Sequence, residues 1–432
     1  MSACPTFLQM TERDQEDMYA ADDLGKRIVG RLPDDMTREW FTLSSDELKP
    51  EQIEATMDLL DSMGARYKFR EALEYARLYG GSGIIAGTRG FDNKAEDPID
   101  LNNIQSVEFL TVLHRWELNP EVPINGDVMS MNFGRPDHYR LNLRTGSEAD
   151  AARAQQLVHW TRLMRFDGDP LPRQIFRENN YWSASVFNRL QNALRNYQTS
   201  HDGVACIMQD FAQAVYKIKD LADIVSSKDG AELLNNRLEA VDLCRSVLNA
   251  VLIGEDEEFE RKTTTLTGIK EVMEIINNRL VAATDMPHTI LLGEGTKAGL
   301  GDKGESEKRD WYDFVHAKQN EMLRWNLEYI IRLIFLSKQG PTGGVEPANW
   351  ELTFNNLWKP TLKEEKETQK IQSEIDEKYA NLGVLGPDEI RESRYGQEKF
   401  SYETKIDDSG VPQDERLPPI DEPEEDNQGD EA

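Results

Sequence analysis

The sequence is poor in cysteine and has no long hydrophobic run. Its 432 residues include three cysteines, Cys4, Cys206 and Cys244. An odd number at this wide spacing matches neither a zinc site nor a disulfide framework, which indicates a reducing cytoplasm. The longest apolar runs, such as YIIRLIF at 329–335, fall far short of the about 20 residues that span a bilayer. The N-terminus lacks a basic region followed by an apolar core, so we expect no signal peptide and no membrane partner.

Basic residues are scarce relative to acidic ones. The chain has 50 lysines and arginines against 79 aspartates and glutamates, which gives a formal net charge of −29. Residues 407–432 hold eleven acids and a single basic residue, Arg416, so this tail carries −10 and the rest carries −19. Tight DNA binding requires many cationic contacts to phosphates, so the chain is a poor candidate for holding DNA tightly. The composition is compatible with DNA that passes by without sticking. The few apolar residues of the tail predict disorder over 406–432.

The usual nucleotide-binding pattern is missing. A phosphate-binding loop requires Ser or Thr directly after its lysine, at the start of a helix. In the glycine-rich segment GEGTKAGLGDKGESE, however, Lys297 is followed by Ala298 and Lys303 by Gly304. We therefore predict that the chain binds no nucleotide and no other cofactor.

Catalytic and metal-binding patterns are also incomplete. His159-Trp160-Thr161 resembles one half of the paired His-x-Thr motif of cyclic phosphodiesterases, in which two histidines act as acid and base on a phosphate. None of the other five histidines is followed two positions later by Ser or Thr. The acidic runs at 34–35 and 255–258 come without histidine partners. We therefore predict no catalytic residue and no metal site.

A glycine-rich loop between two helical segments is the most informative feature that is present. Residues 293–305 contain five glycines, between TGIKEVMEIINNRLVAATDMPHTILL and ESEKRDWYDFVHAKQNEMLRWNLEYIIRLIF. Glycine permits backbone conformations that other residues avoid, and a long loop without secondary structure is usually functional. The apolar stripe of the second segment predicts a long helix from 306.

The remaining chain alternates between helical and strand-like regions. Residues 11–80 predict three helices, TERDQEDMYAADDLGKRIVGRLPDD, KPEQIEATMDLLDSMG and ARYKFREALEYARLYGGSG. Between 83 and 166 we expect the strands GIIAGTRG, VEFLTVLHRWEL, GDVMSMNFG, DHYRLNL and QQLVHWTRLMRF, broken at NPEVP, FGRPD and RTGS. Helical patterns return after residue 182, with strand-like EDEEFERKTTTLTG and NWELTFNNLW further on and two last helices before the tail. The predicted class is α+β and mainly helical.

Several patches together resemble the portal proteins of tailed bacteriophages, in the subfamily with an N-terminal DDMTREW segment. They are DDMTREW at 34–40, ALEYARLYGGSGI at 72–84, WSASVFNRLQNALRNY at 182–197, GIKEVMEIINNRLVAATDMPHTILLG at 268–293 with the loop and helix that follow, and LGVLGPDEIRESRYG at 382–396. The resemblance runs from about residue 11 to residue 400.

The resemblance implies a portal-like subunit with an α/β wing, a helical stem, a small clip, a tunnel loop, a long wing helix and a short helical crown. The implied segments are 1–181, N-terminal wing; 182–224, wing helix and first stem helix; 225–266, clip; 267–292, second stem helix; 293–305, tunnel loop; 306–349, long wing helix and connection; 350–405, C-terminal wing and crown; and 406–432, acidic tail.

It also implies a function. A ring of subunits, a dodecamer, would sit at one capsid vertex of the virion after assembly in the host cytoplasm, and double-stranded DNA would be packaged and ejected through it. The implied partners are the terminase large subunit, the major capsid protein and a head–tail adaptor. The tunnel-loop residues nearest the DNA would be Gly295, Lys297, Gly299, Gly301 and Lys303. Two alternatives remain, a phage nuclease or phosphodiesterase that uses His159, and a monomeric scaffold or adaptor.

Overall fold

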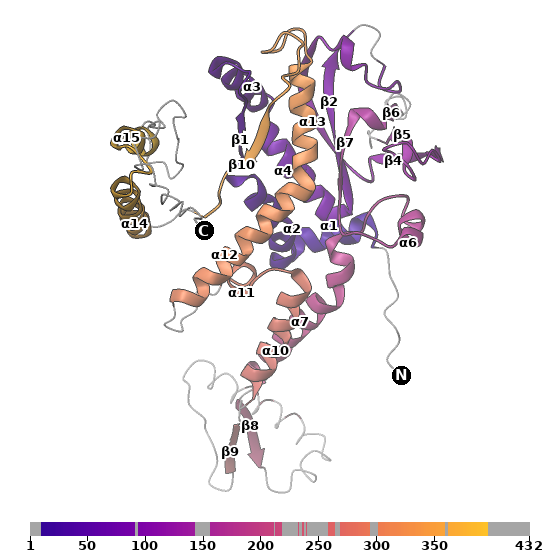
Figure 1. The fold of residues 1–432 in the computed structure, drawn as a ribbon. Helices are drawn as coiled ribbons and strands as arrows, with labels where there is room; N and C mark the ends of the chain where they lie inside the picture. The colour runs from indigo at the N-terminus through magenta and orange to yellow at the C-terminus, as the bar shows by residue number, and fades with distance from the viewer. Residues whose placement is uncertain are drawn as a thin grey trace, which may run out of the picture. The chain divides into compact units, whose positions relative to one another are not determined.

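The chain folds as two compact units, Met1–Leu357 and Trp358–Ala432, which are described separately (Figure 1). The computed structural model describes residues 10–90, 94–142, 156–210, 212–217, 258–263, 268–293, 301–358 and 362–395, and the single residues 232, 236 and 239. Helices predominate and strands form small sheets, which confirms the predicted α+β, mainly helical class. Within these ranges, no helix is long and apolar enough to cross a membrane.

The first unit contains most of the secondary structure. Its helices are α1 (Glu12–Ala21), α2 (Asp23–Arg38), α3 (Pro50–Ser62), α4 (Ala65–Tyr79), α6 (Arg173–Glu178), α7 (Val186–Asp210), α10 (Ile269–Thr284), α11 (His288–Leu291), α12 (Gly301–Lys318) and α13 (Arg324–Phe335). Its strands are β1 (Phe41–Ser44), β2 (Gly81–Arg89), β3 (Ser106–His114), β4 (Leu118–Ile124), β5 (Pro136–Leu141), β6 (Leu157–His159), β7 (Leu163–Asp167), β8 (Ala212–Lys217), β9 (Glu258–Thr263) and β10 (Glu351–Phe354).

The N-terminal helices follow local signals, with one exception. A single helix was expected from residue 11 to 35, but the chain forms α1 and α2 because the Asp22 carboxylate accepts hydrogen bonds from the N–H groups of Leu24 and Gly25. Such a side chain caps a new helix. α3 begins at Pro50, as predicted, and α4 ends at Gly80, whose φ of 92° is the left-handed conformation that favours glycine.

Two three-stranded antiparallel sheets follow, in the orders β3-β2-β7 and β4-β5-β6. Two predictions were wrong here. NPEVP is not a break but part of β4, an edge strand in which prolines are tolerated. GDVMSMNFG is not a strand but a loop, held by a hydrogen bond from the Gly134 N–H to the Asn125 carbonyl. The predicted strand at 155–166 is divided into β6 and β7 by a 3₁₀ turn.

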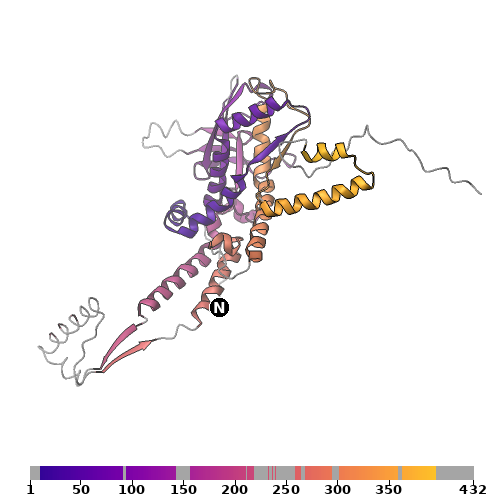
Figure 2. The same ribbon diagram turned by 90° about the vertical axis from the view of Figure 1, so that its left-hand side faces the viewer.

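The main core lies between these sheets and the helices. Phe69, Leu73 and Ala76 are spaced by four and three residues along α4, and each is at most 1% exposed. This spacing puts them on one helix face, and the Phe69 ring meets the edge of Phe166 on β7, with centroids 5.7 Å apart. α12, the π-helical turn Gln319–Leu323 and α13 form one long helical element beside the sheet (Figures 1 and 2). The apolar stripe predicted for it is buried, at Leu327, Ile330, Ile331, Ile334 and Phe335.

α7 and α10 lie side by side, and β8 and β9 pair beyond them (Figure 2). The helix predicted to continue to 224 ends at Asp210 instead. Residues 212–217 form a strand because Val215 and Tyr216, which favour strands, pair with Glu260 and Phe259. Apart from β9 and the three single residues, the predicted clip at 225–266 lies outside the described residues.

The two units divide inside the predicted C-terminal segment 350–405. β10 pairs with β1 and belongs to the first unit. The second unit contains α14 (Leu362–Asn381) and α15 (Pro387–Tyr395), as predicted. The buried Arg394 guanidinium joins these helices by two bonds to the Asp376 carboxylate, at 2.7 and 2.8 Å. The acidic tail predicted to be disordered lies outside the described residues.

Candidate functional site

The predicted tunnel loop, 293–305, overlaps the start of α12. Gly295, Lys297 and Gly299 lie outside the described residues, whereas Gly301 and Lys303 belong to the first turn of α12. The helix therefore begins five residues earlier than the predicted 306. Glycine disfavours a helix by about 1 kcal/mol relative to alanine, so Gly301 and Gly304 pointed to a later start.

The segments on both sides of this loop are anchored in the core. On the preceding side, Met286, Ile290 and Leu291 are at most 6% exposed. On the following side, Trp311 and Val315 of α12 are at most 1% exposed. The described chain is therefore anchored in the core of the first unit up to Leu291 and again from Trp311.

The DDMTREW segment is a structural clamp for α12. The Asp35 carboxylate, 2% exposed, accepts a hydrogen bond from Trp311 Nε1 at 2.8 Å. It also pairs with Arg31 Nε at 2.9 Å and with Arg38 Nη1 at 3.1 Å. The amide of Gln319 donates a 2.7 Å hydrogen bond to a backbone carbonyl of α2. These contacts fix the position of the helix that follows the loop.

His159 has a neighbour that sequence reasoning missed. It is paired with His138 across β5 and β6, and the ring centroids lie 5.1 Å apart. His159 Nδ1 lies 2.8 Å from the Thr161 hydroxyl, and His138 Nε2 lies 3.1 Å from the Glu96 carbonyl oxygen. Burial lowers the pKa of His159, and the charge of His138 acts in the same direction. A second His-x-Thr half would need a hydroxyl side chain two residues after His138, where this chain has Arg140. The two histidines therefore fit a structural role better than a phosphodiesterase site.

The described residues offer no metal centre. Within them, no group of three or more His, Cys, Asp or Glu side chains is placed to hold a metal ion. Cys206 is a free, exposed thiol, while Cys4 and Cys244 lie outside the described residues.

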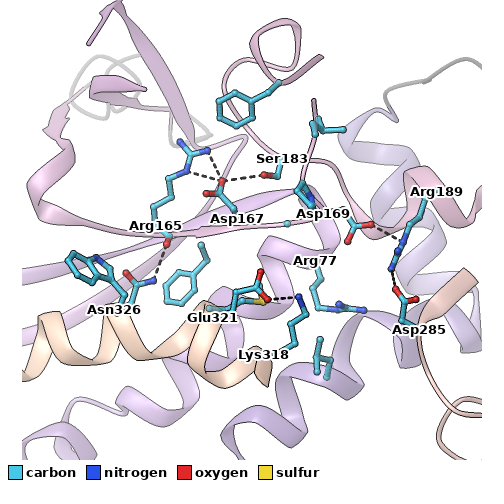
Figure 3. Close-up of a pocket in the computed structure, with 18 of the residues that line it drawn as sticks. Arg77, Arg165, Asp167, Asp169, Ser183, Arg189, Asp285, Lys318, Glu321 and Asn326 are labelled. Atoms are coloured by element: carbon cyan, nitrogen blue, oxygen red, sulfur yellow. Dashed lines mark hydrogen bonds and ion pairs between the residues drawn. The ribbon is translucent and has the colours of Figure 1, made fainter. Parts of the chain in front are cut away.

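A cleft of about 890 Å³ lies between the segment around α6 and the long helical element (Figure 3). Sequence reasoning missed it, because its residues come from separate parts of the chain. Its charged lining consists of seven cations and four acids, Arg77, Arg135, Arg165, Arg173, Arg177, Arg189, Lys318, Asp167, Asp169, Asp285 and Glu321. The cleft is therefore cationic by three formal charges in a chain of net charge −29.

Several of these charges are matched within the cleft. Arg189 bridges Asp169 at 2.9 Å and Asp285 at 2.8 Å, and so joins the start of α7 to the end of α10. Lys318 and Glu321 form a pair at 2.6 Å. The cationic excess must therefore come from the other arginines of the lining.

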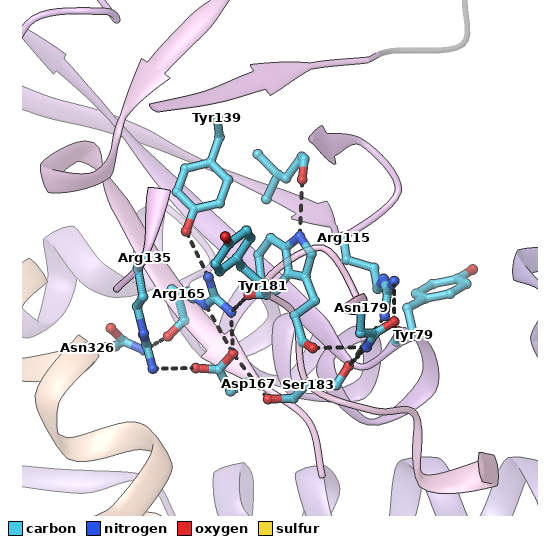
Figure 4. A network of polar contacts seen from close by, with 12 residues as sticks. Tyr79, Arg115, Arg135, Tyr139, Arg165, Asp167, Asn179, Tyr181, Ser183 and Asn326 are labelled. Carbon is cyan, nitrogen blue, oxygen red and sulfur yellow. Dashed lines mark hydrogen bonds and ion pairs between the residues drawn. The ribbon is translucent and has the colours of Figure 1, made fainter. Parts of the chain in front are cut away.

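The wall of the cleft continues into a polar network around Arg165 (Figure 4). Its guanidinium donates to the Asp167 carboxylate at 2.7 Å and to the Tyr139 hydroxyl at 2.8 Å, and lies 4.0 Å from the centroid of the Trp182 ring. Burial opposes the charge of both partners, but their attraction outweighs it. The pKa of Asp167 is therefore lowered and that of Arg165 is raised. Both groups stay ionised at neutral pH, and they hold β7 against the segment that leads into α7.

Two of the portal-like sequence patches touch at this network. A Cβ atom on Gly81 would lie 2.1 Å from Trp182 Cε3, and one on Gly80 would lie 2.3 Å from the Ser183 carbonyl oxygen. Only glycine fits at these positions without displacing the 182–184 segment. The glycines of YGGSGI and the WSAS sequence are therefore parts of one packing arrangement.

A family model and several known proteins resemble this chain. The model, described as phage portal protein, matches residues 14–378. The "Anti-CBASS protein Acb1" of Caulobacter sp. is 28% identical over 368 residues, covering 83% of this chain and 56% of its own length. An uncharacterized protein of Haemophilus influenzae is 24% identical over 353 residues, covering 81% of this chain and 75% of its own. The chain thus spans little more than half the length of the Caulobacter relative.

A solved structure shares the fold. A chain from the neck of an empty GTA particle, computed with C6 symmetry, superposes with a TM-score of 0.52 at 15% identity, covering 90% of this chain and 94% of that chain. The family model extends over most of the sequence and includes the first four of the five patches that carried the resemblance. This chain belongs to the phage portal protein family.

Proposed function

We propose that this chain forms a closed dodecameric ring at one vertex of the phage capsid, and that double-stranded DNA enters and leaves the capsid through the ring. The observation that carries this proposal is the projection formed by α7 and α10, with β8 and β9 paired at its end (Figure 2). Its helices leave apolar side chains exposed, since Ile207, Met208, Val272 and Ile275 are between 42 and 69% exposed. A neighbouring copy in a ring would cover them.

The charge of the chain supports a conduit rather than a DNA-binding protein. A ring whose subunits each carry a net charge of −29 would repel phosphates, so DNA would slide through it. The energy for packaging would then come from a separate motor, the terminase large subunit. A head–tail adaptor and the tail would replace the motor after packaging, and the major capsid protein would surround the ring in the virion. Assembly would take place in the host cytoplasm.

The test of the ring is its mass and shape. In light scattering after size exclusion, the purified chain should run at more than ten times the subunit mass of 49.4 kDa. Negative-stain images should show a ring with a central channel. A stable monomer at micromolar concentration in several buffers would contradict the proposal and favour a monomeric scaffold.

The residues between α11 and α12 are the proposed tunnel loop. Gly295, Lys297 and Gly299, with Gly301 and Lys303 at the start of α12, would lie nearest the DNA, where the lysines make brief, screened contacts to phosphates. Deleting 295–299 should leave assembly intact and impair DNA packaging or retention. Lys297→Ala should have a smaller effect, since one exposed charge adds little attraction. The proposal fails if the deletion prevents most of the assembly and the few rings that still form package DNA normally.

A nuclease or phosphodiesterase that uses His159 is the alternative, favoured by the neighbouring His138. We infer instead that this chain has no catalytic residue. The wild type should leave DNA and cyclic phosphodiesters intact, and His159→Ala should disturb local packing at most. Activity of the wild type that is lost in His159→Ala would establish the alternative.

A further inference from the structure

We propose that copies of this chain bind head to tail, with the acidic face of α3 of one copy seated against the cationic mouth of the cleft of the next. The inference rests on the proposed ring and names the surfaces that close it. The acidic face is defined by Glu51, Glu54, Asp58 and Asp61. The cationic mouth is defined by Arg135, Arg173 and Arg177.

α3 carries charge of one sign on one side. Between Pro50 and Ser62 it has four acids and no basic residue, and all four acids are exposed. At 100° per residue, the four acids fall within an arc of about 80° and extend over about 15 Å. The opposite side packs into the unit through Thr56 and Leu60, which are fully buried. Across the described part of the chain, no salt bridge engages Glu51, Glu54 or Asp58. This face is therefore an unneutralised acidic stripe.

The cationic mouth presents two arginines that form no salt bridge with the described residues of the cleft, and a third, Arg135, that shares the Asp167 carboxylate with Arg165. Arg173 and Arg177 lie four residues apart on α6, so they share one side of the helix. Both are exposed, and neither takes part in a salt bridge with another described residue. Arg135 is 44% exposed and reaches the Asp167 carboxylate through one nitrogen, at 3.2 Å. The stripe and the mouth thus have opposite charge and similar extent.

An apolar loop flanks the mouth and adds a second kind of contact. Val128, Met129 and Met131 are 74, 91 and 77% exposed. The loop is nevertheless ordered by side-chain bonds, since Asn125 Nδ2 donates to the Ser130 hydroxyl at 3.1 Å and the Met129 N–H donates to Asp127 at 2.9 Å. Exposed apolar side chains are typical of a protein contact. Because this loop is already ordered, binding would cost little further conformational entropy.

The two surfaces lie on opposite sides of the first unit. Figure 1 shows α3 on the left, with α6 and the sheet β4-β5-β6 on the right, and the turn in Figure 2 brings α3 toward the viewer. One copy therefore cannot satisfy its own mouth with its own stripe. Two different complementary surfaces make a heterologous contact, which repeats from copy to copy and forms a ring when the rotation closes. A second copy of this chain is thus the occupant that the charge and the placement favour.

Charge reversal of the full-length chain tests the contact. The mouth variant is Arg173→Glu with Arg177→Glu, and the stripe variant is Glu54→Lys with Asp58→Lys. Each should raise the concentration at which half of the protein is in rings, on the order of tenfold, because like charges then face each other. Combining the four substitutions should restore most of the assembly. Lys366→Glu with Lys370→Glu, an exposed pair at the same spacing on α14, is the matched control and should assemble like the wild type.

The readouts are mass photometry and negative staining, with circular dichroism to verify that each variant is folded. Salt well above the physiological value of about 0.15 M should weaken the wild-type rings and reduce the difference between variants. If the wild type forms rings and both reversed variants assemble equally well, this inference is wrong while the proposed function stands. If the combined variant fails to recover, the two surfaces do not meet. If the wild type forms no ring, the proposed function is wrong, and the proposed contact, which rests on it, is wrong too.

Discussion

Asp35→Asn should destabilise the first unit, because the buried Asp35 carboxylate accepts a hydrogen bond from an indole and forms ion pairs with two guanidinium groups. The hydrogen bond from Trp311 joins two side chains that are at most 2% exposed, and a hydrogen bond to a charged group contributes about 1.5–3 kcal/mol. The side chains of Arg31 and Arg38 are 36 and 37% exposed, so each of their ion pairs adds at most about 1 kcal/mol. The expected loss in the free energy of unfolding is about 2–4 kcal/mol.

The assay is urea unfolding at matched protein concentration, with Asp34→Asn as the control. Asp34 is adjacent in sequence but 53% exposed, and its pair with Arg70 at 3.3 Å should contribute little. For a unit of 357 residues, a loss of about 3 kcal/mol corresponds to a fall of about 4 °C in the melting temperature.

A double-mutant cycle with Trp311→Phe separates the indole bond from the ion pairs. Trp311→Phe removes the hydrogen bond, and Asp35→Asn replaces its charged acceptor with a neutral amide oxygen. Both variants therefore act on the same bond, and the double variant should lose about 1 kcal/mol less than the sum of the two. Additive effects would show that the bond is not shared. An Asp35→Asn variant within about 0.5 kcal/mol of the wild type would refute the clamp.

Three further predictions follow from particular residues. Gly81→Ala should lower the free energy of unfolding by about 1–3 kcal/mol because its Cβ would overlap the Trp182 ring; Gly30→Ala, with open space around the new Cβ, is the helical control and should not destabilise. Truncation after Ile406 should leave the melting temperature nearly unchanged, and a fall of many degrees would show that the tail is docked. The unfolded chain should bind a proton at His159 before the folded chain does, because the folded pKa lies below the ordinary value of 6.5. Stability should therefore fall as the pH drops through 6.5, and His159→Gln should flatten this part of the profile.

The sequence predicted those elements whose ends are set by local chemistry. Pro50 at the start of α3 and Gly80 at the end of α4 are both where helix signals placed them. It failed where a distant partner decides the conformation. Residues 212–217 continue a helical pattern in the sequence, and their strand is stabilised by pairing with 258–263. No local signal contains that information.

The candidate site was less predictable than the fold. The tunnel-loop residues remain a prediction, with the helix boundary moved to Gly301. The neighbouring histidines depend on the register between β5 and β6, and register is set by the packing of a whole sheet rather than by the motif around His159. The cleft brings Arg77, Arg173 and Lys318 together from distant parts of the chain, so no spacing in the sequence could reveal it.

In the proposed ring, the acidity of the chain acts differently over short and long distances. At physiological salt, interactions between exposed charges are screened beyond about 8 Å, so the net charges of −29 on neighbouring copies repel mainly where acidic surfaces touch. Assembly therefore depends on what lies at the contact, and an apolar loop beside a cationic mouth is suited to meet an acidic stripe. The same screening limits the influence of the channel wall to DNA that approaches it closely. Repulsion that begins only near the wall would keep the DNA centred without adding a barrier along the axis, which is the condition for sliding.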